Sequence, residues 1–184
     1  MRMDHPLQTS PVTCLASTLG SLLVIGGVAP AAFGQVIPDT TAGSAAVSTN
    51  NLVTITGGVR SENTLFHSFD QFSVDLGQTA RFDNAPDLTA LIARVTGVQP
   101  SVIDGTLAAQ GNADVFLLNP NGIVFGSASQ LNVGGSFIAS TADSVLFDNG
   151  QQFSAVVPQS AALLTVSSPV GLQYGARSNG DVRA

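Results

Sequence analysis

The residue types of a hydrolytic relay occur together in one short stretch, as His67, Ser68 and Asp70. A serine nucleophile needs an imidazole base within hydrogen-bond reach and a carboxylate that orients the imidazole, and separate segments usually supply these groups. Neighbours on one strand point to opposite faces, so this stretch alone cannot form a relay. We therefore predict no catalytic residue and no enzymatic activity, and expect His67 at the rim or cap of the domain.

Carboxylates and arginines suggest a second chemistry, that of a carbohydrate-active β-helix enzyme, which binds calcium through carboxylates and abstracts a proton with a basic residue. The candidates are Asp83, Asp87, Asp104, Asp114, Arg81 and Arg94. They are scattered along the chain, and isolated aspartates beside Gly or Asn are more often turn formers than ligands. Such an enzyme remains a remote alternative.

Metal and cofactor sites also lack the necessary residues. The two histidines are His5 and His67, and the only cysteine, Cys14, lies in a segment that we expect to be removed, which leaves too few ligands for a structural zinc site. The pairs Gly57-Gly58 and Gly134-Gly135 have neither the lysine nor the following helix of a phosphate-binding loop. We predict no metal and no cofactor.

Composition points to a folded β-protein. The 184 residues are 44% hydrophobic with a mean hydropathy of +0.33, which excludes the low-hydrophobicity signature of disorder. Only 10% of residues are charged, against 19 glycines, as in a chain with many turns. Because the net charge is −6, nucleic acids and anionic membrane surfaces are unfavourable partners.

The first 34 residues are typical of a signal peptide. An apolar run over residues 15–28 is followed by the small-residue segment of residues 29–34, which suits a signal peptidase. The run is shorter than the roughly 20 apolar residues of a membrane span. We expect cleavage after Gly34 or Ala32, and no stable membrane span in the remaining domain of residues 35–184.

That remaining domain shows short apolar runs divided by Gly, Asn, Asp or Pro, a pattern that predicts an all-β fold. Candidate strands are 102–107, 113–118, 122–126, 130–134, 136–140 and 144–147. Apolar residues at spacings of two would fill a narrow interior: Leu107, Val115, Leu117, Ile123, Phe125, Leu131, Val133, Phe137, Val145 and Phe147. Glycine-rich turns and the absence of a long polar loop favour a solenoid over a sandwich.

Coils of about 20 to 25 residues would divide this domain into about six coils. Before residue 100 the pattern is less regular, with candidate strands at 66–74 and 80–84. An open solenoid end exposes apolar surface and unpaired strand edges. We therefore expect that region to cap the N-terminal end of the core.

One turn, in the segment LLNPNGIVFG at 117–126, has a well-defined geometry. Pro120 fixes φ, Asn121 tolerates a left-handed conformation, and Gly122 lets the next strand leave without a Cβ clash. The minimal interpretation is a tight corner between two buried strands.

With its neighbours, this turn resembles the N-terminal haemagglutination-activity, or two-partner secretion, domain of filamentous-haemagglutinin-like exoproteins, in the form common in cyanobacteria. The matching segments are FHSFDQFSV (66–74), RVTG (94–97), SVIDGTL (101–107), LLNPNGIVFG (117–126) and LNVGGSFIASTA (131–142). The family's NPNL-type segment nearer the N-terminus is absent. The resemblance implies a right-handed parallel β-helix with an N-terminal β cap.

The resemblance also implies a function. The domain would be the secretion signal and folding nucleus of an exported adhesin-like protein. A partner outer-membrane pore would recognise it, still unfolded, through the pore's periplasmic domains, and the product would be secreted or held at the cell surface. Asn119, Pro120, Asn121, Gly122 and Ile123 match the motif that the family links to secretion.

The alternative function is a surface adhesin in which this domain itself contacts a glycan or a cell. Members of the family usually run far beyond this domain, and the segment LLTVSSPVGLQYG at 163–175 should lead to further coils. We therefore expect the chain to be truncated at its C-terminal end.

Overall fold

The computed structural model describes residues 35–161, 169–175, 177–178 and 180–184. The predicted signal peptide of residues 1–34 lies outside this part. The N-terminal strands are β1 Val36–Pro38, β2 Ser44–Thr49, β3 Leu52–Gly57, β4 Val59–Ser61, β5 Thr64–Phe72 and β6 Thr79–Phe82. The central strands are β7 Ala90–Val95, β8 Ser101–Ile103, β9 Thr106–Ala109, β10 Asp114–Leu118, β11 Ile123–Phe125, β12 Gln130–Asn132 and β13 Phe137–Ser140. The last strands are β14 Ser144–Phe147, β15 Gln152–Ser154, β16 Pro169–Gln173 and β17 Val182–Arg183.

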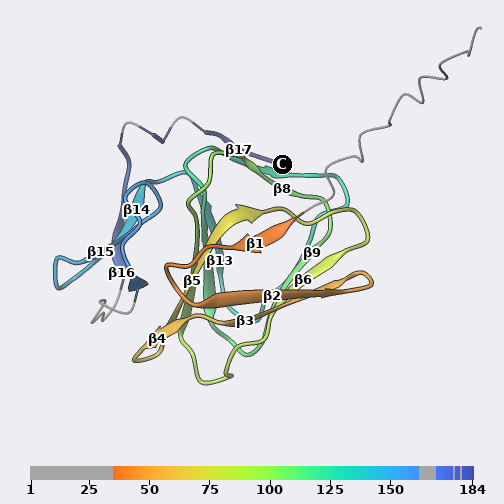
Figure 1. Ribbon diagram of the computed structural model, residues 1–184, viewed down its shortest axis with the longest axis horizontal. Helices are drawn as coiled ribbons and strands as arrows, with labels where there is room; N and C mark the ends of the chain where they lie inside the picture. Colours follow the sequence, from red (N-terminus) through yellow and green to blue (C-terminus); the bar gives the residue numbers. More distant parts are fainter. Residues whose placement is uncertain (1–34, 162–168, 176, 179) are drawn as a thin grey trace, which may run out of the picture. The chain divides into compact units, whose positions relative to one another are not determined.

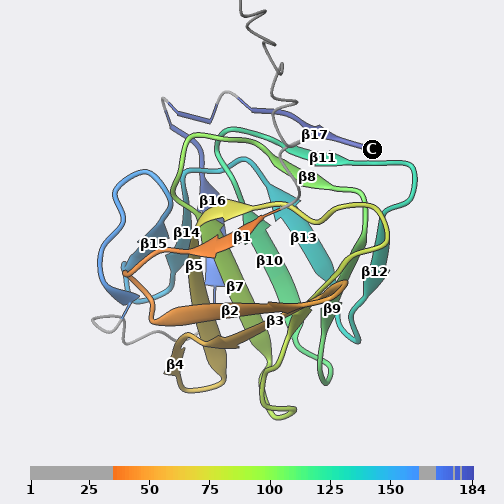
Figure 2. The same cartoon turned by 45° about the vertical axis from the view of Figure 1, so that its right-hand side comes forward.

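Three parallel sheets form a right-handed β-helix, which confirms the predicted fold (Figure 1). The first sheet stacks β5, β7, β10 and β13, the second stacks β3, β6, β9 and β12, and the third stacks β8, β11 and β17. Each coil visits the first, third and second sheets in turn. Figure 2 shows β5, β7, β10 and β13 running side by side.

The solenoid has about three turns, so the prediction of six coils is wrong. Leu91, Val115 and Phe137 occupy equivalent positions in the first sheet, so successive coils advance by 24 and 22 residues. That length agrees with the predicted coil. The number of coils is smaller than predicted because β1, β2 and β4 pair antiparallel in the cap, and β14, β15 and β16 form a separate antiparallel sheet.

The N-terminal cap exists, but a different segment forms it. Strand β1 pairs antiparallel with β5, β2 pairs antiparallel with β3, and β4 pairs antiparallel with β5. The segments expected to form the cap, 66–74 and 80–84, instead supply β5 and β6 of the first coil. Antiparallel pairing with β2 covers one edge of the second sheet, which would otherwise expose unpaired backbone groups.

The solenoid interior is a column of buried apolar side chains that alternate along each strand. Buried members include Val53, Ile55, Phe69, Phe72, Val74, Phe82, Leu91, Val95, Ile103, Leu107, Val115, Leu117 and Ile123. Leu131 aligns with Leu107 but is 48% exposed, because no described strand stacks beyond β12. The prediction that every second residue of a strand points into the interior is therefore confirmed for the strands of complete coils.

A second core lies on the outer face of the first sheet. Phe66, Ile92 and Leu118 point outward and pack against Val145, Phe147 and Phe153. These last residues belong to an antiparallel sheet of β14, β15 and β16. Because both faces of the first sheet are covered, all six residues of β7 are buried.

This antiparallel sheet corrects two expectations. Residues 144–147 were predicted as a solenoid strand, with Val145 and Phe147 inside, but they fill the second core. Residues 163–175 were expected to lead to further coils. Residues 162–168 lie outside the described residues, and β16 pairs antiparallel with β14. The solenoid resumes only at β17, which pairs parallel with β11.

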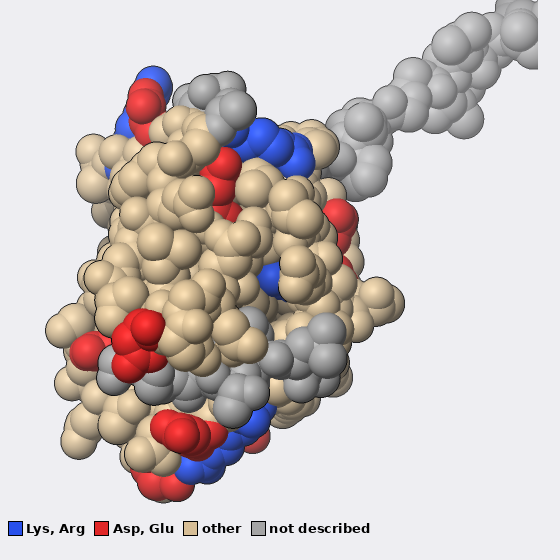
Figure 3. Space-filling view, turned by 90° about the vertical axis from the view of Figure 1, so that its left-hand side faces the viewer, with Lys and Arg blue, Asp and Glu red and all other residues tan. Residues whose placement is uncertain are grey.

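Charged groups are sparse on the surface. The face drawn in Figure 3 is largely uncharged, with acidic and basic side chains in small separate groups. Among the described residues, no helix is long and apolar enough to cross a membrane.

We predict that Phe66→Ala destabilises the protein by about 3 to 5 kcal/mol. The Phe66 side chain is fully buried and its ring lies 4.9 Å from that of Phe153 and 5.8 Å from that of Phe147, centroid to centroid. Urea unfolding followed by circular dichroism measures the change. Val157→Ala, at a residue 64% exposed, should change the free energy of unfolding by less than about 0.5 kcal/mol. Equal effects of the two substitutions would mean that the second core contributes little.

Candidate functional site

The predicted recognition motif forms the corner between β10 and β11, where the chain passes from the first sheet to the third. Asn119 is fully buried at this corner. Its side-chain amide donates to the Gln99 carbonyl and to the Ser101 hydroxyl, both at 3.0 Å. Its backbone N–H donates to the Ser140 carbonyl at 3.0 Å. Asn119 therefore joins its own coil to the coil before and the coil after it.

The next residues complete the corner. The Asn119 side-chain oxygen accepts from the backbone N–H of Asn121 at 3.0 Å, and the Asn121 amide donates to the Gly97 carbonyl at 2.8 Å. Gly122 has a φ of +116°, which favours glycine, and its N–H donates to the Asn119 carbonyl. Ile123 is buried in the interior. All five motif residues thus act together as one structural unit.

The returning chain packs directly on this corner. Gly180 donates its N–H to the Pro120 carbonyl at 3.0 Å, and Ile123 donates to the Asp181 carbonyl at 2.9 Å. A Cβ on Gly180 would clash with the backbone of Gly122. The motif is therefore covered from both sides, by the coil before it and by the segment that leads into β17.

The coiled architecture of this chain is also found in a known secretion domain. The model of the TPS secretion domain matches residues 34–184. This chain belongs to the TPS secretion domain family. It therefore carries a secretion-signal domain, and the family is one of secretion domains, not of enzymes.

Individual proteins and solved structures are also similar to this chain. The heme/hemopexin-binding protein of Haemophilus influenzae (strain ATCC 51907 / DSM 11121 / KW20 / Rd) is 38% identical over 104 residues, which are 55% of this chain and 11% of that protein. This chain thus spans about a tenth of that relative. The filamentous hemagglutinin secretion domain aligns with a TM-score of 0.50 at 24% identity, over 60% of this chain and 43% of that one, and shares the fold. The HMW1 secretion domain of Haemophilus influenzae aligns with a TM-score of 0.45 at 30% identity, over 56% and 26%.

The structure separates the three residues first considered for hydrolysis. His67 points into the solenoid interior and packs against the rings of Phe69 and Phe82, whereas Ser68 points to the outer face. The His67 Nδ1 lies 3.0 Å from the Ser44 hydroxyl, so His67 contacts the cap, but it is 1% exposed and does not lie at a rim. Burial lowers the pKa of His67 to about 4, which keeps its ring neutral.

The carboxylates considered for calcium binding serve separate structural roles. Asp87 pairs with Arg60, Asp83 accepts from Gln110, Asp104 accepts from the Ala128 N–H, and Asp114 accepts from the Ser136 N–H. Within the described ranges, no three His, Cys, Asp or Glu residues converge as metal ligands would.

Arg94, considered as a base, is a buried structural cation. It is 1% exposed, and its guanidinium donates to the Ser68 hydroxyl and to the carbonyls of Ser154 and Gln159, each at 2.8 Å. Its carbon Cζ lies 4.0 Å from the Phe153 ring centroid. Burial lowers the pKa of Arg94 to about 10, although the negative charge of Asp39 acts to raise it. The guanidinium therefore stays protonated at neutral pH.

Sequence reasoning missed the groups that balance this cation. Asp39 accepts hydrogen bonds from Ser68, Thr41 and Thr96, and the hydroxyl of Thr41 also accepts from Arg94. Burial alone would raise the pKa of Asp39, but these hydrogen bonds outweigh it and lower the pKa below its ordinary value. These residues are up to 57 positions apart in sequence, so no local pattern indicated them.

We predict that Asn119→Ala lowers the free energy of unfolding by about 1 to 3 kcal/mol, because the buried Ser101 hydroxyl and Gln99 carbonyl lose their donor. Urea unfolding measures the change. Asn132→Ala, at an exposed residue of β12, is the matched control and should be near neutral. If Asn119→Ala is as stable as the control, the side-chain hydrogen bonds of Asn119 do not contribute measurably to stability.

We also predict that stability falls as pH drops from about 6.5 to about 4. The unfolded chain binds a proton on His67 near pH 6.5, whereas the folded chain resists protonation down to about pH 4. The folded state is thus penalised across this window, by at most about 3 kcal/mol, and unaffected above it. Urea unfolding at pH 7.5 and pH 4.5 measures the loss. His67→Gln should remove most of that difference; an unchanged difference would assign it to other groups.

Proposed function

We propose that residues 35–184 are the secretion signal that a partner outer-membrane pore captures through its periplasmic domains, before the chain folds. One observation carries this proposal furthest: in the folded corner, the side-chain amides of Asn119 and Asn121 are already bonded to protein groups. A partner that uses these amides must bind them before the corner closes. Membership of the TPS secretion domain family supports the role of such a partner.

The same proposal includes the route of export. Residues 1–34 act as a signal peptide that is cleaved after Gly34 or Ala32, and the family match begins at residue 34, in agreement with that boundary. The chain then crosses the periplasm and the outer membrane, and is released or held at the cell surface. After residue 34 the chain contains no cysteine, so no disulfide within it can hinder threading through a pore.

We further propose that the folded domain nucleates the coils that follow it. Strand β12 aligns with β9 below it, and its three residues are exposed. The alignment of Leu131 with Leu107 supplies an apolar position for a following coil to cover. The segment leading into β17 already stacks on β11 in this way, which supports addition of strands at this end.

Recognition and folding can be separated with one matched variant. The experiment measures capture of urea-unfolded, freshly diluted chain by the immobilised periplasmic domains of the pore. We predict that Asn119→Ala and Asn121→Ala each weaken capture at least tenfold, because each removes an amide that the partner bonds. Ser101→Ala removes one of the two folded-state acceptors of the Asn119 amide and leaves the motif intact, so capture should be unchanged.

Two results would contradict this assignment. Full capture of both asparagine variants would remove Asn119 and Asn121 from recognition. Equal loss with Ser101→Ala would mean that capture needs the folded corner. Prefolded wild-type chain should be captured less well than unfolded chain, since the amides are then buried in protein contacts.

A further inference from the structure

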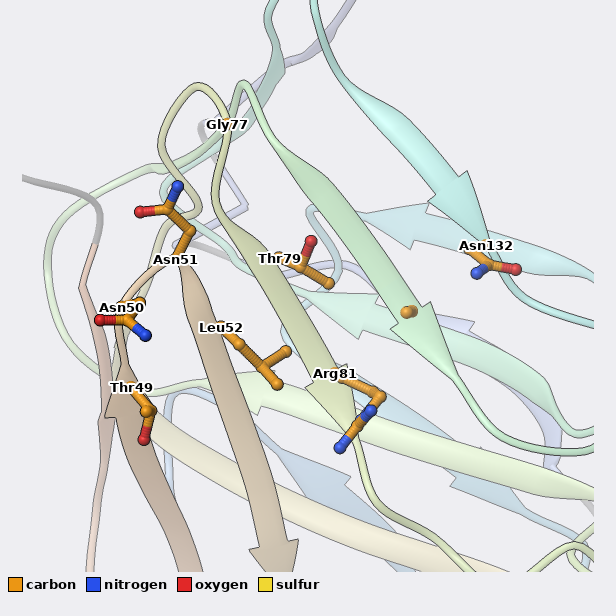
Figure 4. A pocket seen from close by; sticks show the side chains of 9 residues that line it. Thr49, Asn50, Asn51, Leu52, Gly77, Thr79, Arg81 and Asn132 are labelled. Atoms are coloured by element: carbon orange, nitrogen blue, oxygen red, sulfur yellow. The ribbon is translucent and has the colours of Figure 1, made fainter.

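An open groove lies on the outer face of the second sheet, on the strands β3, β6, β9 and β12 (Figure 4). Its volume is about 620 Å³, within the usual size of ligand sites. Figure 4 shows Leu52 beside Arg81, with Asn50 and Asn51 at the turn before β3 and Asn132 on the far strand. Nothing in the secretion role uses this groove.

The strand register explains why this face is hollow. Arg81, Ala108 and Asn132 stand at equivalent positions on β6, β9 and β12. Neighbouring strands lie about 4.8 Å apart, so the backbones of Arg81 and Asn132 are separated by about 10 Å. The single methyl group of Ala108 between them leaves space that a longer side chain would fill.

Arg81 has no partner in the described part of the chain. Its Nε is covered by protein yet makes no hydrogen bond, and no ion pair reaches its guanidinium. In contrast, Arg60 pairs with Asp87, Arg183 pairs with Asp181, and Arg94 is fully engaged in the outer core. An unbonded guanidinium N–H shielded from water is costly, and a ligand oxygen that draws the side chain into the groove would relieve that cost.

We propose that this groove binds the carboxylate of a terminal acidic sugar, with Arg81 as the charged contact. A planar guanidinium binds a carboxylate through two parallel hydrogen bonds. The amides of Asn50, Asn51 and Asn132 and the hydroxyl of Thr79 can exchange hydrogen bonds with sugar hydroxyls, and Leu52 can pack against the apolar face of the ring. Because the chain carries a net charge of −6, the groove suits one carboxylate better than a polyanion.

The test is a titration of the full-length exported chain with D-galacturonate, D-galactose and acetate, followed by calorimetry and by amide chemical shifts of the groove residues. We expect saturable galacturonate binding, with galactose and acetate each at least tenfold weaker. Arg81→Gln should weaken galacturonate binding at least tenfold and should not lower the unfolding midpoint, because the Arg81 Nε makes no hydrogen bond that the fold would lose. Arg60→Gln removes the same charge elsewhere and should leave binding unchanged.

Each contrary result overturns the proposal. Binding of acetate as tightly as galacturonate would leave a general anion site, and binding of galactose as tightly would exclude the carboxylate. If Arg60→Gln and Arg81→Gln weaken galacturonate binding equally, the effect comes from overall charge and not from the groove. No saturation by galacturonate at tens of millimolar, or shifts away from the groove, would exclude a sugar site here. Capture by the pore is a separate measurement, so either proposal can fail alone.

Discussion

Hydrogen bonding between successive coils is the constraint on which this structure depends. A strand in a parallel β-helix has no partner within its own coil, so its backbone groups need the coils before and after it. The strands satisfy this need along the three sheets, but the corners interrupt the ladder. At the corner after β10, Asn119 replaces the missing ladder. Its side chain bonds to the preceding coil, and its backbone N–H bonds to Ser140 of the following coil.

The cap and the outer antiparallel sheet follow from the same constraint. A stack of coils leaves an open edge at its start and bare outer faces on its sheets, and the apolar outer residues Phe66, Ile92 and Leu118 need a cover. Arg94 ties these coverings to the solenoid, since its bonds reach Thr41 after β1, Ser68 of β5 and Ser154 of β15. Removing one partner of a buried cation is expensive, so this network specifies how cap, coil and outer sheet meet.

Local features of the fold could be predicted from the sequence. Short alternating runs separated by glycine-containing turns indicated β10, β11 and β13 within a residue or two, because alternation and turn composition are properties of neighbouring residues. The direction in which a strand pairs is not local. The run at 144–147 alternates like a solenoid strand, yet it pairs antiparallel outside the solenoid, because its partners Phe153 and Leu172 lie in later segments. Contacts between segments distant in sequence also bury Arg94 and set the number of coils, so neither could be predicted correctly from local patterns.

A motif that serves the folded corner and also a partner would make export directional. The side-chain amides of Asn119 and Asn121 would be free for such a partner only while residues 97–101 are not in place. On the proposed route of export, those groups would assemble around the asparagines outside the cell, and the free energy of folding would then oppose return of the motif to the pore. Each segment that stacks afterwards adds hydrogen bonds and so increases the free energy of folding, as the bond from Gly180 to Pro120 does here. If the proposed route holds, folding itself would favour movement outward without any other source of energy on that side of the membrane.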